Sequence, residues 1–196
     1  MKNFKIHLNY KSRNQESFLN TENKTDEYQD MVYKYTYDVV LKNNYNKIVD
    51  IGCGSAFKLF KYFNDYEFIG YELKKTVNYL IKKHPNNIWV ESDFNVEPDI
   101  KTDIIICADV IEHILNPDEL LLWISKFDVK DIIISTPNRD LLVKYRGISN
   151  DGPPVNPYHI REWSFNEFEK YIGEYFNIIN HFNIDDECCQ VIHCKK

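Results

Sequence analysis

The sequence predicts an α/β fold, a three-layer sandwich on a seven-stranded, mainly parallel sheet with an antiparallel strand at its C-terminal end. Strand-like and helix-like stretches alternate along the middle of the chain, which is typical of parallel sheets. Residues 104–106 and 132–134 are both Ile-Ile-Ile runs, as expected of central strands that helices cover on both faces. Two apolar stretches near the C-terminus flank the acidic residues 185–187, which favours a hairpin at one sheet edge.

The length and charge of the chain set its domain organisation and exclude some partners. With 196 residues, one domain buries about 70% of the surface of the unfolded chain. The net charge of −6, from 24 basic and 30 acidic side chains, argues against a broad basic surface, so we expect no DNA partner. We expect a polar, flexible N-terminal arm over residues 1–25, either poorly ordered or ordered over a site, and one domain over residues 26–196.

The first helix is expected to begin near Asp26, because Gln29 stands three residues later as a capping-box partner. Its apolar positions recur at helical spacing, and it ends in the polar residues 42–44. Strands are expected at residues 47–51, 67–72, 88–91, 103–108, 131–135, 176–184 and 190–194.

Helices are expected between most of these strands. Two of them occupy residues 56–63 and 74–83, and a third begins at Pro117, directly after an Asn that caps it. After an irregular stretch rich in Gly and Pro, a capping box of Ser164 and Glu167 opens the last helix.

A glycine-bearing turn joins the first strand to the helix after it. Gly52 and Gly54 lack a Cβ, so they adopt positive φ and allow a ligand to approach the backbone. The following helix directs free N–H groups and its positive dipole end toward such a ligand, which predicts a nucleotide site. A dinucleotide fingerprint needs a small residue where Phe57 stands, so a nicotinamide-dependent oxidoreductase is disfavoured.

An acid stands two residues before the first glycine, in the pattern Asp50-x-Gly52-x-Gly54-x-Ala56. This pattern resembles motif I of class I S-adenosylmethionine (SAM) dependent methyltransferases, in which the last small residue is often Gly. The resemblance covers residues 45–195. It implies a Rossmann-like fold, a methyltransferase activity and SAM as the cofactor.

Further segments resemble the same family in chain order. Glu72 ends the second strand, 18 residues beyond Gly54, where a carboxylate accepts the hydroxyls of a ribose. Asp93 and Phe94 stand where the family places an acid and an aromatic ring against the adenine. Residues 107–118 and 135–138 resemble segments of the group that includes ubiquinone-type O-methyltransferases. The resemblance implies these cofactor-binding residues: Asp50, Gly52, Cys53, Gly54, Glu72, Asp93, Phe94 and Ala108.

Two histidines are candidate catalytic bases, since a hydroxyl acceptor must lose a proton during methyl transfer. His113 follows the fourth strand, and His159 lies in a polar stretch that prolines interrupt. A structural, hydrogen-bonding role explains each of them equally well, so both interpretations stay open. Asp109-x-x-Glu112-His113 with His159 also resembles the metal site of small-RNA 2′-O-methyltransferases, in which a divalent ion would polarise a diol or a catechol. Metal binding is left open, because the first acid here is Asp rather than Glu.

We expect the enzyme to O-methylate a hydroxyl of a small molecule, such as a saccharide of a surface glycan. Residues 154–163 resemble a segment of methyltransferases associated with surface-glycan assembly, and Tyr158, Arg161 and Trp163 are expected to line the acceptor pocket. The alternatives are a non-catalytic SAM-binding or scaffold protein and an RNA 2′-O-methyltransferase.

The cysteines and the hydropathy pattern indicate the setting of the protein. The five cysteines lack a C-x-x-C spacing, so we interpret even the C-terminal group near His193 as structural rather than metal-binding. No apolar run approaches 18 residues, so we expect no membrane insertion. A reducing, cytoplasmic location is the expectation.

Overall fold

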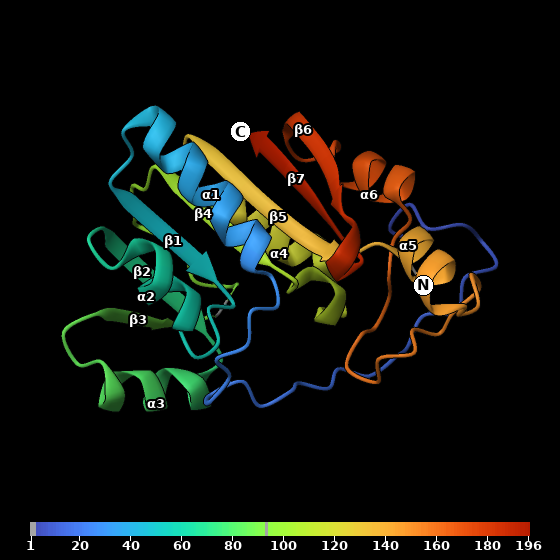
Figure 1. Ribbon diagram of the computed structural model, residues 1–196, viewed down its shortest axis with the longest axis horizontal. Helices are drawn as coiled ribbons and strands as arrows, with labels where there is room; N and C mark the ends of the chain where they lie inside the picture. Colours follow the sequence, from blue (N-terminus) through green and yellow to red (C-terminus); the bar gives the residue numbers. More distant parts are fainter. Residues whose placement is uncertain (1–2, 93) are drawn as a thin grey trace.

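The computed structural model describes residues 3–92 and 94–196 and contains one seven-stranded sheet in the order β3-β2-β1-β4-β5-β7-β6 (Figure 1). The first five strands run parallel, and β7 pairs antiparallel with both β5 and β6. The predicted fold class is therefore confirmed. The strands are β1 Lys47–Ile51, β2 Glu67–Glu72, β3 Ile88–Glu91, β4 Ile104–Ala108, β5 Asp131–Pro137, β6 Asn177–Ile184 and β7 Cys189–Lys195.

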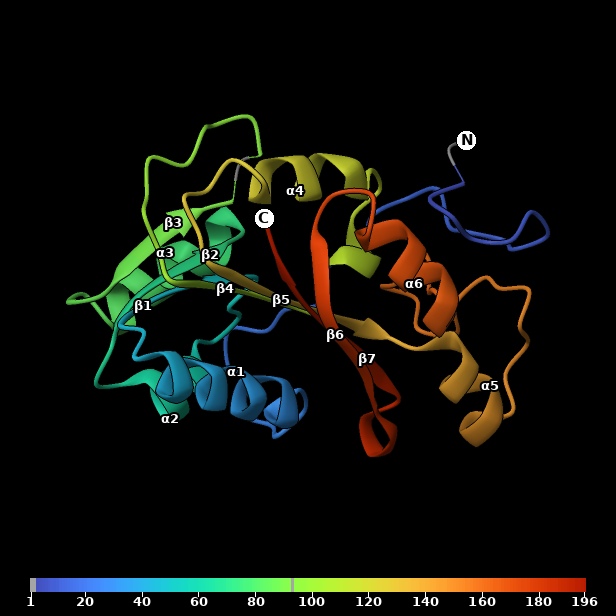
Figure 2. The ribbon, with the colours of Figure 1, turned by 90° about the horizontal axis from the view of Figure 1, so that it is seen from above.

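Helices cover both faces of the sheet. One core lies under α1 (Asp30–Asn43), α2 (Phe57–Phe63) and α3 (Lys74–Lys83). The other lies under α4 (Pro117–Ile124) and α6 (Phe165–Ile172). Figure 2 shows α1 and α2 on one side of the sheet and α4 and α6 on the other. None of the helices in the described ranges is long and apolar enough to cross a membrane.

The central strands are buried along their whole length, as the two Ile-Ile-Ile runs predict. Every residue of β4 and of β5 is buried. Parallel strands covered on both faces need apolar side chains in both directions, which explains the continuous runs. The hairpin at the sheet edge also forms, with the short 3₁₀ helix η2 (Asp185–Glu187) between β6 and β7.

The first helix begins at Asp30, so the prediction of a start near Asp26 is wrong. Gln29 takes the left-handed conformation, with φ of 67°, and makes no side-chain cap. Its backbone N–H donates instead to the carboxylate of Glu187, at 3.1 Å. An acid from the β6–β7 hairpin thus satisfies a helix terminus that the sequence assigned to a local capping box.

A helix that the sequence did not predict precedes the irregular stretch of residues 147–157. α5 covers Arg139–Arg146, with the side chain of Asn138 accepting a hydrogen bond from Asp140 N and Gly147 ending it at φ of 63°. An Asn before and a Gly after a short polar segment are ordinary cap signals. These cap signals alone do not predict a helix, because the apolar pattern of the segment is weak.

Two residues expected in the acceptor pocket belong to the core instead. Arg161 is 1% exposed and donates to the carbonyls of Ile114 and Leu115, at 2.8 and 2.9 Å. Trp163 is fully buried and stacks on Tyr171, with ring centroids 5.7 Å apart. The expectation that they line the pocket is wrong, because long-range partners satisfy their polar groups inside the fold.

Residues 3–29 contain no helix or strand, yet they follow a defined course past the carboxyl ends of the strands (Figure 1). Ile6 is 5% exposed within the core, and the indole of Trp163 donates to the carbonyl of Phe4 at 2.9 Å. Arg13 N donates to Ile160 O at 2.8 Å. These contacts show where the arm packs, and its flexibility stays a prediction.

Candidate functional site

One cavity of about 730 Å³ lies at the carboxyl ends of the parallel strands. Its wall runs from the glycine turn after β1, past the ends of β2 and β3, to the residues that follow β4. That volume lies in the range of small-molecule and cofactor pockets. Open α/β sheets bind ligands at this edge, so the position agrees with the nucleotide-type site that the sequence predicts.

The turn itself has the conformation that its glycines predict. Gly52 and Gly54 have φ of 79° and 54°, and both line the cavity together with Cys53. Gly52 N donates to Tyr71 O at 2.8 Å, which ties the turn to β2. A Cβ on Gly54 would lie 3.2 Å from the hydroxyl of Thr21, so the N-terminal arm passes directly over the turn.

Asp50 lies beneath the turn rather than on the cavity wall. It is fully buried, and its Oδ2 accepts a hydrogen bond from the hydroxyl of Tyr33 at 2.8 Å. Its Oδ1 has no hydrogen-bond partner among the described residues. Burial raises the pKa of Asp50 from 3.8 to about 7, while the Tyr33 hydrogen bond opposes this shift. Its predicted role in cofactor binding stays a prediction.

The raised pKa of Asp50 makes the stability of the free protein depend on pH. A folded-state pKa of about 7 lies above the reference value of 3.8, so the folded state holds the proton more tightly and stability falls as pH rises toward 7. Asp50→Asn removes this loss. We expect the difference in free energy of unfolding between the variant and wild type to grow by about 3 kcal/mol, in favour of the variant, from pH 5 to pH 8. Urea unfolding at both pH values measures the gap, and a gap that does not change with pH would contradict the assignment.

The other predicted cofactor-binding residues lie along the same wall. Glu72, Phe94 and Ala108 all line the cavity. Burial raises the pKa of Glu72, and its Oε2 accepts a hydrogen bond from Leu73 N. The Phe94 ring packs 5.4 Å from that of Trp123. Asp93 lies outside the described residues.

Glu72→Ala is expected to weaken the binding of SAM and of S-adenosylhomocysteine equally, by about 1–3 kcal/mol. The reason is that both molecules carry the ribose whose hydroxyls the carboxylate would accept. Calorimetric titration of each molecule measures the effect. Glu67→Ala is a matched control, since Glu67 begins the same strand β2, away from the cavity, and pairs with Lys47. Equal affinities in both variants and wild type would overturn the role of Glu72.

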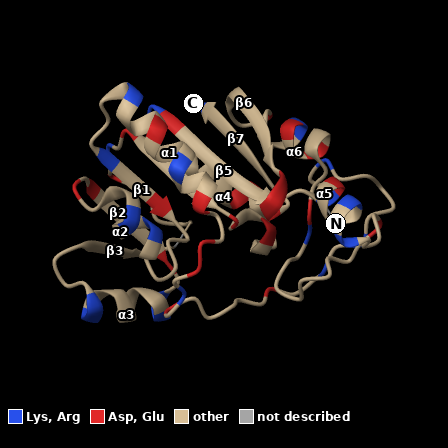
Figure 3. Cartoon of the chain, viewed as in Figure 1, with Lys and Arg blue, Asp and Glu red and all other residues tan. Residues whose placement is uncertain are grey.

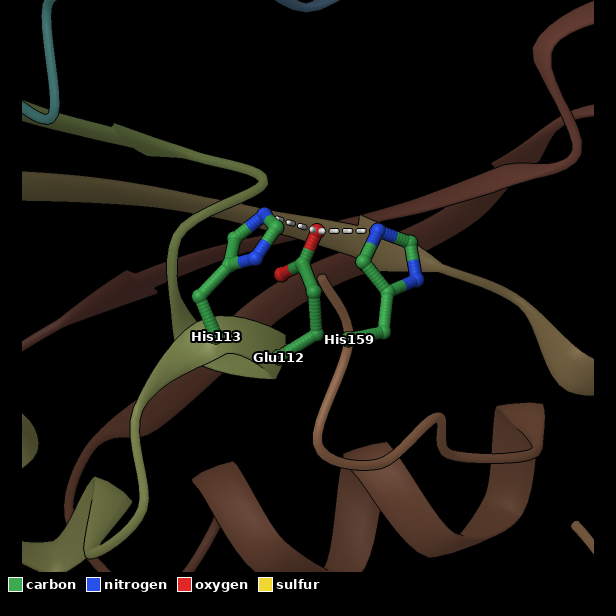
Figure 4. Close-up of side chains that lie close together, drawn as sticks. All are labelled: Glu112, His113 and His159. Carbon is green, nitrogen blue, oxygen red and sulfur yellow. Dashed lines mark ion pairs between the residues drawn. The ribbon is translucent and has the colours of Figure 1, made fainter. Parts of the chain in front are cut away.

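The part of the cavity that follows β4 brings together Glu112, His113 and His159. One Glu112 oxygen lies between the two imidazole rings (Figure 4). Glu112 Oε1 is 3.8 Å from His113 Nε2 and 4.0 Å from His159 Nε2. Glu112 and His113 lie in the 3₁₀ helix η1 (Ile111–His113) after β4, and His159 comes from the loop before α6. We call these three residues the Glu-His-His group.

Hydrogen bonds fix the orientation of both rings. The Nδ1–H of His113 donates to Tyr158 O at 2.8 Å, and that of His159 donates to a Glu162 carboxylate oxygen at 2.7 Å. Each ring therefore presents the lone pair of Nε2 to the group. Burial, and then the neighbouring His159, lowers the pKa of His113, so its ring stays neutral.

The residues of the Glu-His-His group fit a divalent metal ion. Three ligand atoms, one carboxylate oxygen and two imidazole nitrogens, lie within 4.8 Å of one another. Glu112 Oε1 is buried and has no hydrogen-bond partner among the described residues, whereas Oε2 accepts from the Thr136 hydroxyl at 3.1 Å. Outer hydrogen bonds to Tyr158 and Glu162 orient the two rings as ligating histidines require. The Asn156 amide, now 2.9 Å from His159 Nε2, would have to turn away.

Asp109, the first acid of the sequence pattern, stands apart from this group. Its Oδ1 accepts hydrogen bonds from the Ser135 hydroxyl, at 2.6 Å, and from the Cys189 thiol, at 3.5 Å. Its Oδ2 is buried with no hydrogen-bond partner among the described residues. Burial, and then the charge of Asp109, raises the pKa of Glu112 well above its ordinary value.

The charges of the cavity wall are mostly acidic. Figure 3 shows acidic positions at the turn between β6 and β7. The acidic wall residues are Asp26, Glu72, Asp109, Glu112, Glu162 and Glu187. Such a wall suits a cationic ligand, and SAM carries a sulfonium and an ammonium group.

Sequence reasoning left open that the arm orders over a site, but it did not identify which residues of the arm contribute to this wall. Tyr28 and Gln29, which the sequence assigned to the first helix, line the cavity together with Phe18, Leu19 and Thr21. No local pattern signals these contacts, because they depend on the path of the chain across the strand ends. The five cysteines are buried and free, as expected.

A family model described as "Methyltransferase domain" matches residues 16–186. It thus covers the glycine turn, all residues of the Glu-His-His group and most of the sheet. No curated protein matches the chain.

Several solved structures share the fold. The methyltransferase domain of bacterial CtHen1 is 18% identical, with a TM-score of 0.65 over 88% of this chain and 100% of that chain. An S-adenosylmethionine-dependent methyltransferase from Clostridium acetobutylicum ATCC 824 is 13% identical, with a TM-score of 0.63 over 85% and 91%. A protein from Pyrococcus horikoshii OT3 is 16% identical, with a TM-score of 0.65 over 90% and 94%. At these identities the likeness concerns the fold alone.

Proposed function

The chain belongs to the methyltransferase domain family and is a SAM-dependent methyltransferase, and from this premise we propose that it methylates a hydroxyl group of a sugar. The observation that carries the proposal is the Glu-His-His group, Glu112, His113 and His159, which shares one cavity with the glycine turn. A methyl donor over the turn and a hydroxyl at this group would meet within the same enclosed space.

The residues of the Glu-His-His group have two uses in such a reaction. They would hold a divalent cation, which when bound polarises a hydroxyl and lowers its pKa. Nε2 of each imidazole also offers a lone pair that accepts a proton. Transfer forms a C–O bond, breaks the S–C bond of the sulfonium and leaves S-adenosylhomocysteine. The hydroxyl proton passes to one of these bases or to solvent.

The surroundings of the group favour an acceptor with adjacent hydroxyls. The Asn156 amide and the Tyr158 side chain line the cavity beside it and offer polar contacts to a sugar. Leu142, Ile148 and Val155 add apolar wall that packs against the faces of a sugar ring or a larger substituent. We propose a saccharide as the acceptor, and the cytoplasm as the setting, in keeping with the buried free cysteines.

A second candidate acceptor is the terminal ribose of RNA, which also has adjacent hydroxyls. The Glu-His-His group favours it, because these residues resemble the metal site of small-RNA 2′-O-methyltransferases. The net charge of −6 favours the saccharide, because RNA binding draws on basic surface for its phosphates.

Purified protein with labelled SAM and added Mg²⁺ or Mn²⁺ tests the proposal. The acceptors are saccharides with and without adjacent hydroxyls, and RNA oligonucleotides ending in a ribose or in a 2′-deoxyribose. We expect methyl transfer to diol-bearing saccharides. Transfer to the ribose-ended RNA alone would establish the second candidate. SAM binding without transfer to any acceptor would support the non-catalytic alternative and overturn the proposal.

A further inference from the structure

The cavity spans the point where the order of the strands reverses. The turn after β1, Glu72 after β2 and Phe94 after β3 lie on one side of this switch point, where the donor is expected. Residues of η1 after β4 lie on the other side. A methyl group passing from the donor to the Glu-His-His group must therefore cross the border between β1 and β4. The sulfonium belongs at this border.

Tyr28 reaches the border from the side of α1. Its side chain lines the cavity, and 43% of the residue is exposed there. Its hydroxyl is close enough to Asp109 and Glu112 for both to raise its pKa, after the larger effect of burial. Both acids follow β4, and they line the same cavity as Tyr28.

The neighbouring Gln29 holds Tyr28 in this position. The Gln29 amide donates to the carbonyl of Ala108, the last residue of β4, at 3.1 Å. Its backbone N–H donates to Glu187 of the β6–β7 hairpin, also at 3.1 Å. Gln29 and Asp109, which follows Ala108, both have positive φ, of 67° and 52°. Non-glycine residues in this conformation are strained and cluster at functional sites. Two such residues on one cavity wall therefore indicate that this part of the wall has a functional role.

Four other aromatic residues of the wall lie elsewhere. Phe94 follows β3 and Phe57 begins α2, both on the donor side. The hydroxyl of Tyr33 is bound to Asp50 beneath the turn. Tyr158 lies beside the Glu-His-His group, where its carbonyl accepts from His113. Phe18 and Tyr28 both come from the arm, and of these two rings Tyr28 is the one that adjoins Gln29, which is bound to the end of β4.

We propose that the ring of Tyr28 contacts the sulfonium of SAM and aligns its methyl group toward the acceptor side. A cation over the face of an aromatic ring is attracted by the ring quadrupole, and more strongly where the cavity desolvates it. Residues 18–29 of the N-terminal arm then form part of the donor site. The inference depends on SAM binding in this cavity and is independent of the identity of the acceptor.

The test compares two ligands that differ in charge at sulfur. S-adenosylhomocysteine has the ribose, adenine and amino acid of SAM but a neutral thioether, so only SAM offers a cation to the ring. We expect Tyr28→Leu to weaken SAM binding by about fivefold to thirtyfold and to change S-adenosylhomocysteine binding less than twofold. Tyr28→Phe keeps the ring and should retain the affinity of wild type for both ligands. Calorimetric titration of wild type and both variants gives all six values.

Each outcome separates this inference from a structural role of Tyr28. A variant that folds poorly would lose both ligands together, and equal losses for SAM and S-adenosylhomocysteine would overturn the proposal. An equal loss of SAM in Tyr28→Phe and Tyr28→Leu would assign the effect to the hydroxyl and overturn the ring contact. Acceptor assays play no part, so failure to find a saccharide acceptor leaves the result intact.

Discussion

Glu112→Gln is expected to lower the rate of methyl transfer by at least about 100-fold while SAM affinity stays within twofold of wild type. The substitution keeps the size of the side chain but replaces a carboxyl group, which can become an anionic metal ligand, with a neutral amide that faces two imidazole nitrogens. Glu112 lies on the acceptor side of the cavity, so the donor site should be spared. Turnover of the acceptor and calorimetric titration of SAM measure the two effects.

Removal of a bound metal tests the same role of Glu112 by a second measurement. Wild type should lose activity in a chelator and regain it with Mg²⁺ or Mn²⁺, and titration of Mn²⁺ should show a site that Glu112→Gln and His159→Gln both lack. His181→Gln is a matched control, because His181 is a partly buried histidine on β6 whose ring bonds to Gln190, away from the cavity. It should bind Mn²⁺ like wild type.

Two other outcomes have distinct meanings. Full wild-type activity in chelator, with a loss in His113→Gln or His159→Gln, would make that histidine a metal-free base. Wild-type rates in chelator for Glu112→Gln and both histidine variants would show that none of the three residues is catalytic. Positioning of donor and acceptor would then account for the whole rate.

The features that local rules control could be predicted from the sequence. The β4 and β5 runs follow from the need to cover both faces of a parallel strand. The glycine turn follows from its requirement for positive φ at Gly52 and Gly54. The capping box of Ser164 and Glu167 also forms as predicted, because both of its hydrogen bonds lie within four residues.

The errors concern partners that are distant in the sequence. Glu187 binds the N–H of Gln29 and moves the helix start, and no window around Asp26 contains that information. Arg161 reads as a polar pocket residue until the carbonyls of residues 114 and 115 are placed beside it. Burial of a charged side chain depends on such partners, which only the fold brings together.

The candidate site shows both situations in one place. The sequence pattern indicated Glu112 and His113 as candidate site residues. Their proximity to His159, however, depends on the course of the loop before α6. The direction of each Nε2 lone pair depends in turn on Tyr158 O and the Glu162 carboxylate. Sequence reasoning therefore identified the residue types of the group, and the fold supplied their orientation.

Gly52→Ala is expected to destabilise the protein by about 2–5 kcal/mol and to weaken SAM binding at least tenfold. Positive φ costs a side chain about 1–2 kcal/mol. In addition, the new Cβ would overlap a methyl group of Val110, and overpacking of this kind costs about 1–3 kcal/mol. Both residues line the cavity, so the shift that relieves the overlap deforms the donor site. Urea unfolding and SAM titration measure the two losses.

Gly147→Ala separates the two causes. Gly147 has φ of 63°, but a Cβ there would meet nothing within 4 Å, and the residue ends α5 without lining the cavity itself, although its neighbours Arg146 and Ile148 do. It should lose only the conformational part, about 1–2 kcal/mol, and keep the SAM affinity of wild type. Adding Val110→Ala to Gly52→Ala should restore room for the Cβ, so the double variant should be more stable than the sum of the single losses predicts. If Gly52→Ala and Gly147→Ala lose equal stability, and Val110→Ala restores none of it, the close approach of Val110 to the turn contributes nothing to the need for glycine at position 52.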